Sequence, residues 1–124
     1  MALWPESTEN HNIRFKIGNR LFLTPSAAVY LVQVPQLEYL KVCETTCVDI
    51  DETIRLLNGC AKSESIRHFT WSPIEWHHEL ALAMVMKMPN LDQFSARRCP
   101  EKYRAAFEQK YKCSWLKIYY SSPP

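Results

Sequence analysis

The sequence predicts an α/β protein in which a parallel sheet forms one face of a short stack of repeats and helices form the other. Short extended segments alternate with helix-capable segments along the chain, an order that favours parallel strands joined by helical crossovers. The extended segments also share one spacing of apolar residues, which is typical of a repeat architecture. The chain has 124 residues, two glycines and no linker-like segment, so we expect a single domain.

The first two helices are predicted from their flanking residues. Thr24 places a capping hydroxyl just before a proline, and residues 27–33 supply the helical segment. Asp49 is expected to cap a second helix that contains residues 52–57. Gly59 follows that segment and predicts a left-handed residue at the helix end, because glycine adopts this conformation without steric cost.

Two further helices are expected in the second half of the chain. Residues 72–75 read Ser-Pro-Ile-Glu, a capping box with proline at the first helical position. This helix should continue to about Met88 and bury one apolar stripe. The stripe consists of Leu80, Ala81, Met84, Val85 and Met88. The last helix is expected over residues 100–111.

The extended segments repeat one another. They are residues 13–17, 37–42, 66–71, 91–96 and 114–120. Each segment can be assigned to a six-residue unit whose first, fourth and sixth residues, here called places 1, 4 and 6, are apolar. Two units depart from this pattern at place 1, which holds Asn12 in the first unit and Cys113 in the last. The units start at residues 12, 37, 66, 91 and 113, so the steps are 25, 29, 25 and 22 residues. Such steps are typical of repeats of about 20–29 residues in which each unit supplies one strand and one helix.

This pattern resembles the leucine-rich repeat, whose consensus is L-x-x-L-x-L-x-x-N/C-x-L. Among the ninth places, Cys99 alone carries the asparagine or cysteine of the consensus. Gly59-Cys60, shortly before the third unit, resembles the cysteine-containing variant in the substrate-binding part of F-box proteins. The resemblance implies a short solenoid with a parallel sheet of about five strands, and a protein-binding role such as substrate recognition in ubiquitination.

The repeat also predicts which side chains are buried and which are outward. Place 4 should form one continuous core, with Leu40, Phe69, Phe94 and Leu116 stacked on neighbouring strands. Places 2, 3 and 5 should point outward and contact a partner protein, because tyrosine, tryptophan and arginine are enriched at binding hot spots. The expected partner-binding residues are Arg14, Tyr39, Lys41, His68, Gln93, Trp115 and Lys117.

The two ends are expected to differ from the repeat domain of residues 12–120. Residues 1–11 are predicted to be a flexible lead, and residues 121–124 a tail. The strand over residues 114–120 would be the last in the sheet, and an open strand edge readily pairs with another chain. We therefore expect this strand to contact a partner or to mediate self-association.

No motif predicts an enzyme, a cofactor or a metal centre. His77-His78-Glu79 lacks the second histidine of the H-E-x-x-H metalloprotease helix. Cys43 and Cys47 form only one loose pair, whereas structural zinc usually shows two tight pairs. Five cysteines without a secretory signal indicate reduced thiols in a cytoplasmic or nuclear protein.

One alternative function remains open from the sequence. The stretch from Arg97 to Lys117 holds seven basic residues interleaved with aromatic ones, so it could bind the phosphates of a nucleic acid. An amphipathic last helix with its basic face in water explains the same residues, and the net charge of the chain is only +2. No apolar run is long enough to span a membrane.

Overall fold

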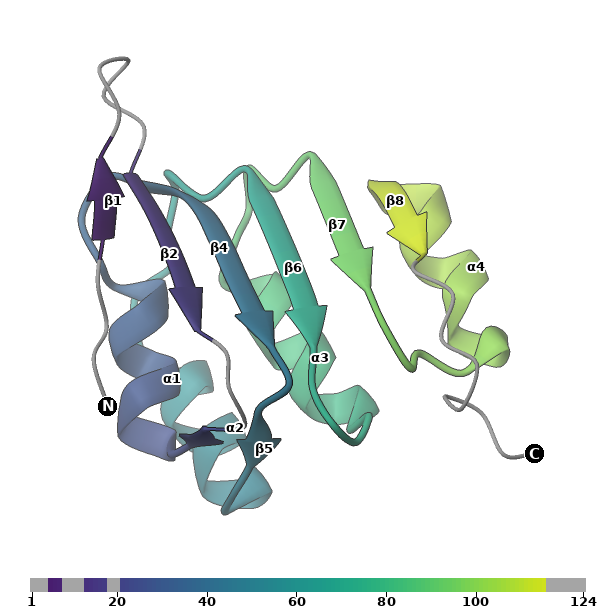
Figure 1. Cartoon of the computed structure of the whole chain (residues 1–124), viewed down its shortest axis with the longest axis horizontal. Coiled ribbons are helices and arrows are strands. Elements are labelled where there is room, and N and C mark those ends of the chain that lie inside the picture. The colour runs from purple at the N-terminus through teal and green to yellow at the C-terminus, as the bar shows by residue number, and fades with distance from the viewer. Residues whose placement is uncertain (1–4, 8–12, 18–20, 116–124) are drawn as a thin grey trace.

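The main feature of the computed structural model, which describes residues 5–7, 13–17 and 21–115, is a six-stranded sheet. Its strands follow the order β1-β2-β4-β6-β7-β8 (Figure 1). They are β1 (Pro5–Ser7), β2 (Ile13–Ile17), β4 (Leu37–Cys43), β6 (His68–Ser72), β7 (Gln93–Ala96) and β8 (Lys112–Trp115). β1 pairs antiparallel with β2, and every pair from β2 to β8 is parallel. The α/β class with parallel strands is therefore confirmed.

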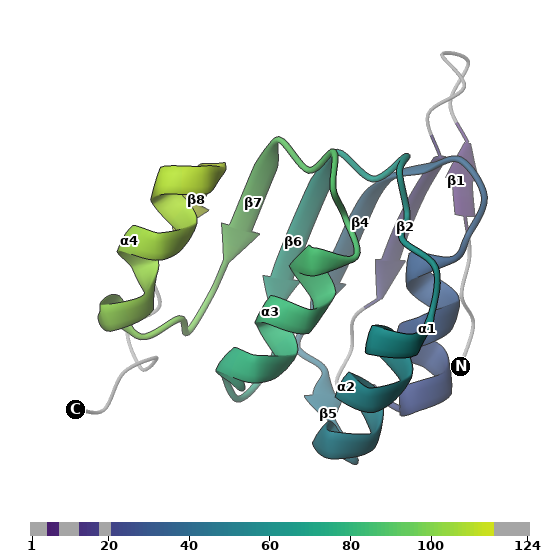
Figure 2. The same ribbon diagram turned by 180° about the vertical axis from the view of Figure 1, so that it is seen from behind.

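All helices of the described chain lie on one side of this sheet, behind it in Figure 1 and in front of it in Figure 2. They are α1 (Pro25–Val32), α2 (Ile50–Gly59), α3 (His78–Met86) and α4 (Glu101–Lys110). Each helix connects a strand of the main sheet to its neighbour, so the chain winds steadily from β2 to β8. Two short parallel strands, β3 (Phe22–Leu23) and β5 (Thr46–Cys47), add a second small sheet.

The hydrophobic core lies between the sheet and the helices. Leu40 pairs in register with Phe69, and Phe69 with Phe94, and all three side chains are at most 1% exposed. This confirms the predicted stacking of place 4 on neighbouring strands. In β8, however, Cys113 stands opposite Phe94, and the predicted position of Leu116 opposite Phe94 is wrong. Leu116 itself lies outside the described residues.

The start of α1 follows the sequence prediction. The Oγ1 atom of Thr24 accepts a hydrogen bond from the backbone N–H of Ala27 at 3.2 Å, and Pro25 is the first helical residue. The hydroxyl thus satisfies one of the backbone donors that every helix start leaves without a partner inside the helix.

α2 differs from the prediction at both ends. Asp49 precedes the helix, but its side chain makes no capping bond, and its backbone is left-handed with φ of 54°. Its carbonyl oxygen instead accepts the Oγ1–H of Thr53 at 2.9 Å. The predicted left-handed turn at Gly59 is wrong, because Gly59 is helical and Cys60 ends the helix in an extended conformation.

α3 begins at His78, five residues later than its capping box predicts. Ser72 is buried as the last residue of β6, so its hydroxyl does not open a helix. The backbone after it makes tertiary contacts: the N–H of Ile74 donates to the carbonyl oxygen of Thr45, and the carbonyl oxygen of Pro73 accepts from Arg98. The predicted apolar stripe is confirmed, since Leu80, Ala81, Met84, Val85 and Met88 are all buried.

A buried lysine connects the ends of α2 and α3. The Nζ atom of Lys87 donates a hydrogen bond of 2.7 Å to the carbonyl oxygen of Cys60, just beyond α2. The carbonyl oxygen of Lys87 accepts from the backbone N–H of Ser63. Cys60 therefore marks the end of α2 that is bonded to the residue following α3.

The structure bears on three further predictions, which concern the two chain ends and membrane-spanning helices. Residues 5–7 fall in the predicted flexible lead, yet they form β1 on the edge of the sheet. The predicted tail of residues 121–124 lies outside the described residues. Within the described ranges, no helix has the length and apolar character needed to cross a bilayer.

Candidate functional site

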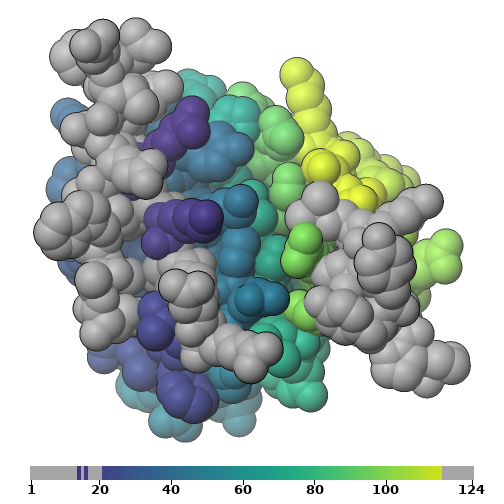
Figure 3. Space-filling model, in the orientation of Figure 1, coloured from purple at the N-terminus to yellow at the C-terminus, as the bar shows by residue number. Residues whose placement is uncertain are grey.

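No described helix covers the face of the main sheet opposite α1, α2, α3 and α4 (Figures 1 and 2). We call it the open face. Figure 3 looks onto it and shows side chains of β2, β4, β6 and β7 succeeding one another across the surface. Alternate residues of each strand point to this face, because successive side chains of a strand point to opposite sides of the sheet.

The outward side chains form two rows that run across the strands. The first row consists of Arg14, Tyr39, His68, Gln93 and Lys112, which pair with one another in register. The second row consists of Lys16, Lys41, Thr70, Ser95 and Ser114. All ten side chains are exposed or half-buried, whereas Leu40, Val42 and Phe69 between them on β4 and β6 are buried.

Three neighbours in the first row stack on one another. The Cζ atom of Arg14 lies 4.6 Å from the centre of the Tyr39 ring. The Tyr39 ring in turn stacks on the His68 ring at 5.1 Å, with 25° between the two planes. A cation over an aromatic face is attractive, and the stack holds all three side chains in a fixed arrangement. The row therefore presents the polar ends and edges of its side chains in a defined order.

The structure brings together five of the seven residues that the sequence predicts for partner binding. Arg14, Tyr39, His68 and Gln93 lie in the first row, and Lys41 lies in the second. Lys117 lies outside the described residues.

The predicted outward position of Trp115 is wrong. Trp115 pairs with Ala96, an inward residue, and is half-buried against the core. Its ring lies 6.2 Å from the ring of Phe94 and 6.3 Å from that of Phe107. The strand is displaced by three residues from the predicted register, which turns this side chain to the helix side of the sheet.

Two basic residues in or next to the strands of the open face, Lys112 and Arg97, are absent from the predicted partner-binding residues. Lys112 directly follows the helix expected over residues 100–111, but it begins β8 and pairs with Gln93. Arg97 falls one residue beyond the predicted strand, yet its backbone N–H continues the ladder by donating to the carbonyl oxygen of Trp71. Its Nε atom is buried and has no hydrogen-bond partner within the described residues. The signal that could find Arg97 is the alternation Gln93, Ser95, Arg97.

The charge on the open face is one-sided. Neither row contains an aspartate or a glutamate. Glu38 lies where the register between β2 and β4 shifts, at the amino edge of the sheet. At the other side, Glu6 of β1 stands opposite Arg14 in the backbone pairing. From β2 to β8 the charged residues of the two rows are therefore all cations, and Glu6 continues the first row at its β1 margin.

Within the described residues, no three His, Cys, Asp or Glu side chains lie close enough to hold a metal ion. All five cysteines are free thiols. Burial raises the pKa of Cys47 and of Cys113 to about 11 and that of Cys99 to about 12. These three thiols therefore stay protonated near neutral pH, and a protonated thiol is a poor nucleophile.

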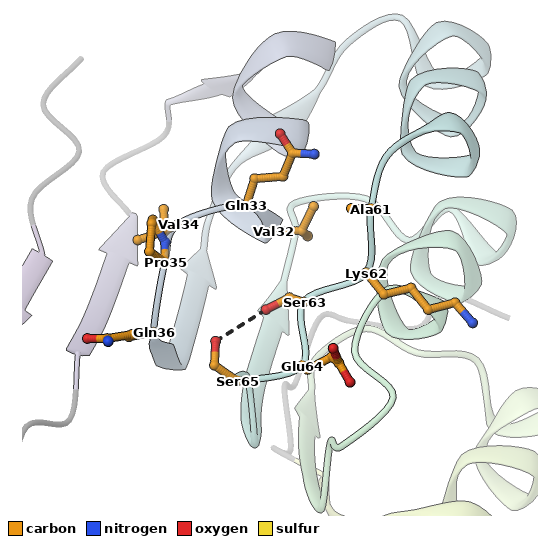
Figure 4. Close-up of a pocket in the computed structure, with 10 residues that line it drawn as sticks. All are labelled: Val32, Gln33, Val34, Pro35, Gln36, Ala61, Lys62, Ser63, Glu64 and Ser65. Atoms are coloured by element: carbon orange, nitrogen blue, oxygen red, sulfur yellow. Dashed lines mark hydrogen bonds between the residues drawn. The ribbon is translucent and has the colours of Figure 1, made fainter.

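A pocket of about 520 Å³ lies at the amino edge of the sheet, between the loop after α1 and the loop after α2 (Figure 4). In it the hydroxyl groups of Ser63 and Ser65 face one another at 3.5 Å. A second hollow of about 480 Å³, lined by Glu38 and Arg67, shares Glu64 with the first. Both hollows are open and lined mainly by loop residues.

An aromatic cluster joins the start of α3 to α4. The His78 ring stacks on the Tyr103 ring at 3.4 Å with 8° between the planes, and it also lies near the rings of Trp76 and Phe107. Burial lowers the pKa of His78, an effect that Lys102 reinforces and Glu79 opposes. The folded protein therefore favours the neutral imidazole.

This cluster predicts a loss of stability in mild acid. Because the folded pKa of His78 is below its ordinary value of 6.5, the unfolded chain takes up the proton first as the pH falls. The urea midpoint of the native chain should drop between about pH 7.5 and about pH 5.5, whereas His78→Phe should lose less over the same range. Equal losses in the two proteins would contradict the prediction, since the two proteins differ only at residue 78.

Comparison with known proteins adds no relative: no protein-family model, curated protein or solved structure matches the chain. The geometry of the open face therefore carries the functional argument by itself.

Proposed function

We propose that the chain is an irregular leucine-rich-repeat-like module that binds another protein through the open face of its sheet. The observation that carries the proposal is the first row, in which Arg14, Tyr39 and His68 stack in register on three neighbouring strands. Rigid aromatic and arginine side chains on a scaffold of strands lose little freedom on binding and commonly dominate the affinity of interfaces.

The repeat interpretation is supported by the units themselves. Leu40, Phe69 and Phe94 occupy the same place in three consecutive units and pack on one another through the sheet. α1 contacts α2, and α2 contacts α3, so neighbouring units stack on the helix side as well. A stack of this kind presents a broad sheet surface to a partner. By the resemblance to F-box proteins, a segment of a ubiquitination substrate is one such partner.

The nucleic-acid alternative is weakened by where the basic C-terminal residues lie. The cationic groups of Lys102, Arg104 and Lys110 each lie over an aromatic ring in or after α4, at 5.0 to 5.6 Å from the ring centre. Lys112 belongs to the open face instead. These four basic residues are therefore divided between two sides of the sheet.

Selection from a random peptide library displayed on phage tests the proposal. We expect recovered peptides to bind the native chain and to lose about tenfold or more in affinity for the double variant Tyr39→Ala, His68→Ala, because this change removes the stack without opening the core. Affinities measured by fluorescence anisotropy with synthetic peptides give the result.

Tyr30→Ala is the matched control, because Tyr30 is an exposed tyrosine on α1, on the helix side of the sheet. It should leave peptide affinity unchanged. Peptides that depend on Tyr30 and ignore Tyr39 and His68 would place binding on the helix side and overturn the proposal. Recovery of no specific peptide from repeated selections would overturn it as well.

A further inference from the structure

We infer that the partner segment bound by the open face is acidic and extended, and that it lies across the strands along the two rows. This inference rests on the proposed function and names the chemistry of the partner. Three observations support it: the two rows carry cations, two lysines face one another on adjacent strands, and the ring of Tyr39 is stacked between Arg14 and His68.

Between β2 and β8, the charged residues of the two rows are all cations. They are Arg14 and Lys16 on β2, Lys41 on β4 and Lys112 on β8. Elsewhere Arg55 pairs with Glu52 at 2.6 Å, and Lys87 donates to a carbonyl oxygen. Among the described side chains, no ion pair involves a cation of the two rows. A positive surface of this kind favours a negatively charged partner by complementarity.

The pair formed by Lys16 and Lys41 strengthens the argument. These two lysines stand directly opposite one another on β2 and β4, in the second row. Like charges directly opposite one another in a sheet are destabilising, since their side chains are about 5 Å apart at the β-carbon. A carboxylate placed between the two ammonium groups would turn this repulsion into attraction, so the pair is arranged as a site for an anion.

The spacing of the cations sets the length of the segment. Basic residues lie on β2 and β4 at one end and on β8 at the other, while Thr70 and Ser95 occupy the middle of the second row. Four strand spacings separate β2 from β8, about 19 Å, which is the length of about six residues of extended chain. The expected ligand has acidic residues near both ends of such a stretch and uncharged polar residues between them.

The stack in the first row favours a peptide over a single-stranded nucleic acid. Single strands bind to proteins largely through bases that stack on free aromatic faces. Tyr39 has Arg14 over its ring and His68 stacked on it, so its faces are already occupied. What remains outward is a series of donors, including the guanidinium of Arg14 and the amide of Gln93, which suit carboxylates and peptide carbonyl groups.

The composition of the selected peptides is the first test. Peptides that depend on Tyr39 and His68 should be enriched in aspartate and glutamate relative to the unselected library. Their affinity should fall about tenfold or more for Lys41→Glu, and also when NaCl is raised from about 50 to about 300 mM, because salt screens the attraction. Lys62→Glu is the matched control: Lys62 is an exposed lysine in the loop after α2, and the same charge reversal there should change affinity little.

Lys41→Gln supplies a readout that needs no ligand. It removes one of two facing positive charges, so the urea midpoint of the free protein should stay the same or rise while peptide affinity falls. Face-dependent peptides that are neutral or basic would overturn the acidic partner and leave the proposed function standing. Absence of face-dependent peptides would overturn both. Tighter binding of a single-stranded oligonucleotide that displaces the peptides would replace the acidic peptide by a nucleic acid.

Discussion

Phe94→Ala should lower the free energy of unfolding by about 3–5 kcal/mol, because it removes a fully buried aromatic side chain and leaves a cavity. Phe94 is 0% exposed and lies at the centre of the core. Its ring is 5.7 Å from that of Phe69 and 4.9 Å from that of Phe107, so it connects two strands with α4. Urea unfolding followed by far-UV circular dichroism measures the loss.

Phe22→Ala is the matched control for this experiment. Phe22 lies on β3 and is 64% exposed, so the same truncation there should change the free energy of unfolding by less than about 1 kcal/mol. A loss at Phe94 no larger than the loss at Phe22 would show that the sheet and α4 do not share one core.

The parts of the fold that could be predicted are those in which a local signal agrees with the hydrophobic pattern. Thr24 before a proline fixes the start of α1 through a contact between near neighbours, and the structure forms that contact. Leu40, Phe69 and Phe94 repeat at one place of their units, and each unit offers only one way to bury its apolar side. Local propensity and burial then specify the same structure.

The parts that could not be predicted depend on contacts between distant residues. Ser72 has the local chemistry of a helix cap, but β6 extends through it, and the following backbone bonds to Thr45 and Arg98 instead. Asp49 is left-handed because the chain has to turn between β5 and α2, and the sequence at that point carries no glycine. A short stretch of sequence around Ser72 or Asp49 contains no sign of either effect.

Most of the open face could be predicted because it depends only on alternation within strands. Arg14, Tyr39 and His68 follow directly from the register of the first three parallel strands. Lys112 could not, because its assignment depends on where α4 ends and β8 begins. The stack of Arg14 on Tyr39 and of Tyr39 on His68 could not be predicted either, because it joins side chains of three paired strands.

The register of β8 leads to the last prediction. Trp115→Ala should lower the free energy of unfolding by about 2–4 kcal/mol, somewhat below the range for a fully buried aromatic residue. The ring of Trp115 packs on the rings of Phe94 and Phe107, and its side chain is half-buried against the core. Urea unfolding of the variant beside Phe94→Ala measures the loss.

The Trp115→Ala substitution distinguishes between two registers of β8 against β7. The segment after Tyr111 is apolar at residues 113, 115, 116 and 118, so two registers both put apolar side chains inward. With Leu116 opposite Phe94, Trp115 would be outward, and its truncation would leave stability unchanged while weakening peptide binding. With Cys113 opposite Phe94, Trp115 is inward, and its truncation lowers stability while peptides bind the folded variant as before. The two outcomes differ in both measurements, because a shift of three residues exchanges the faces of every side chain in the strand.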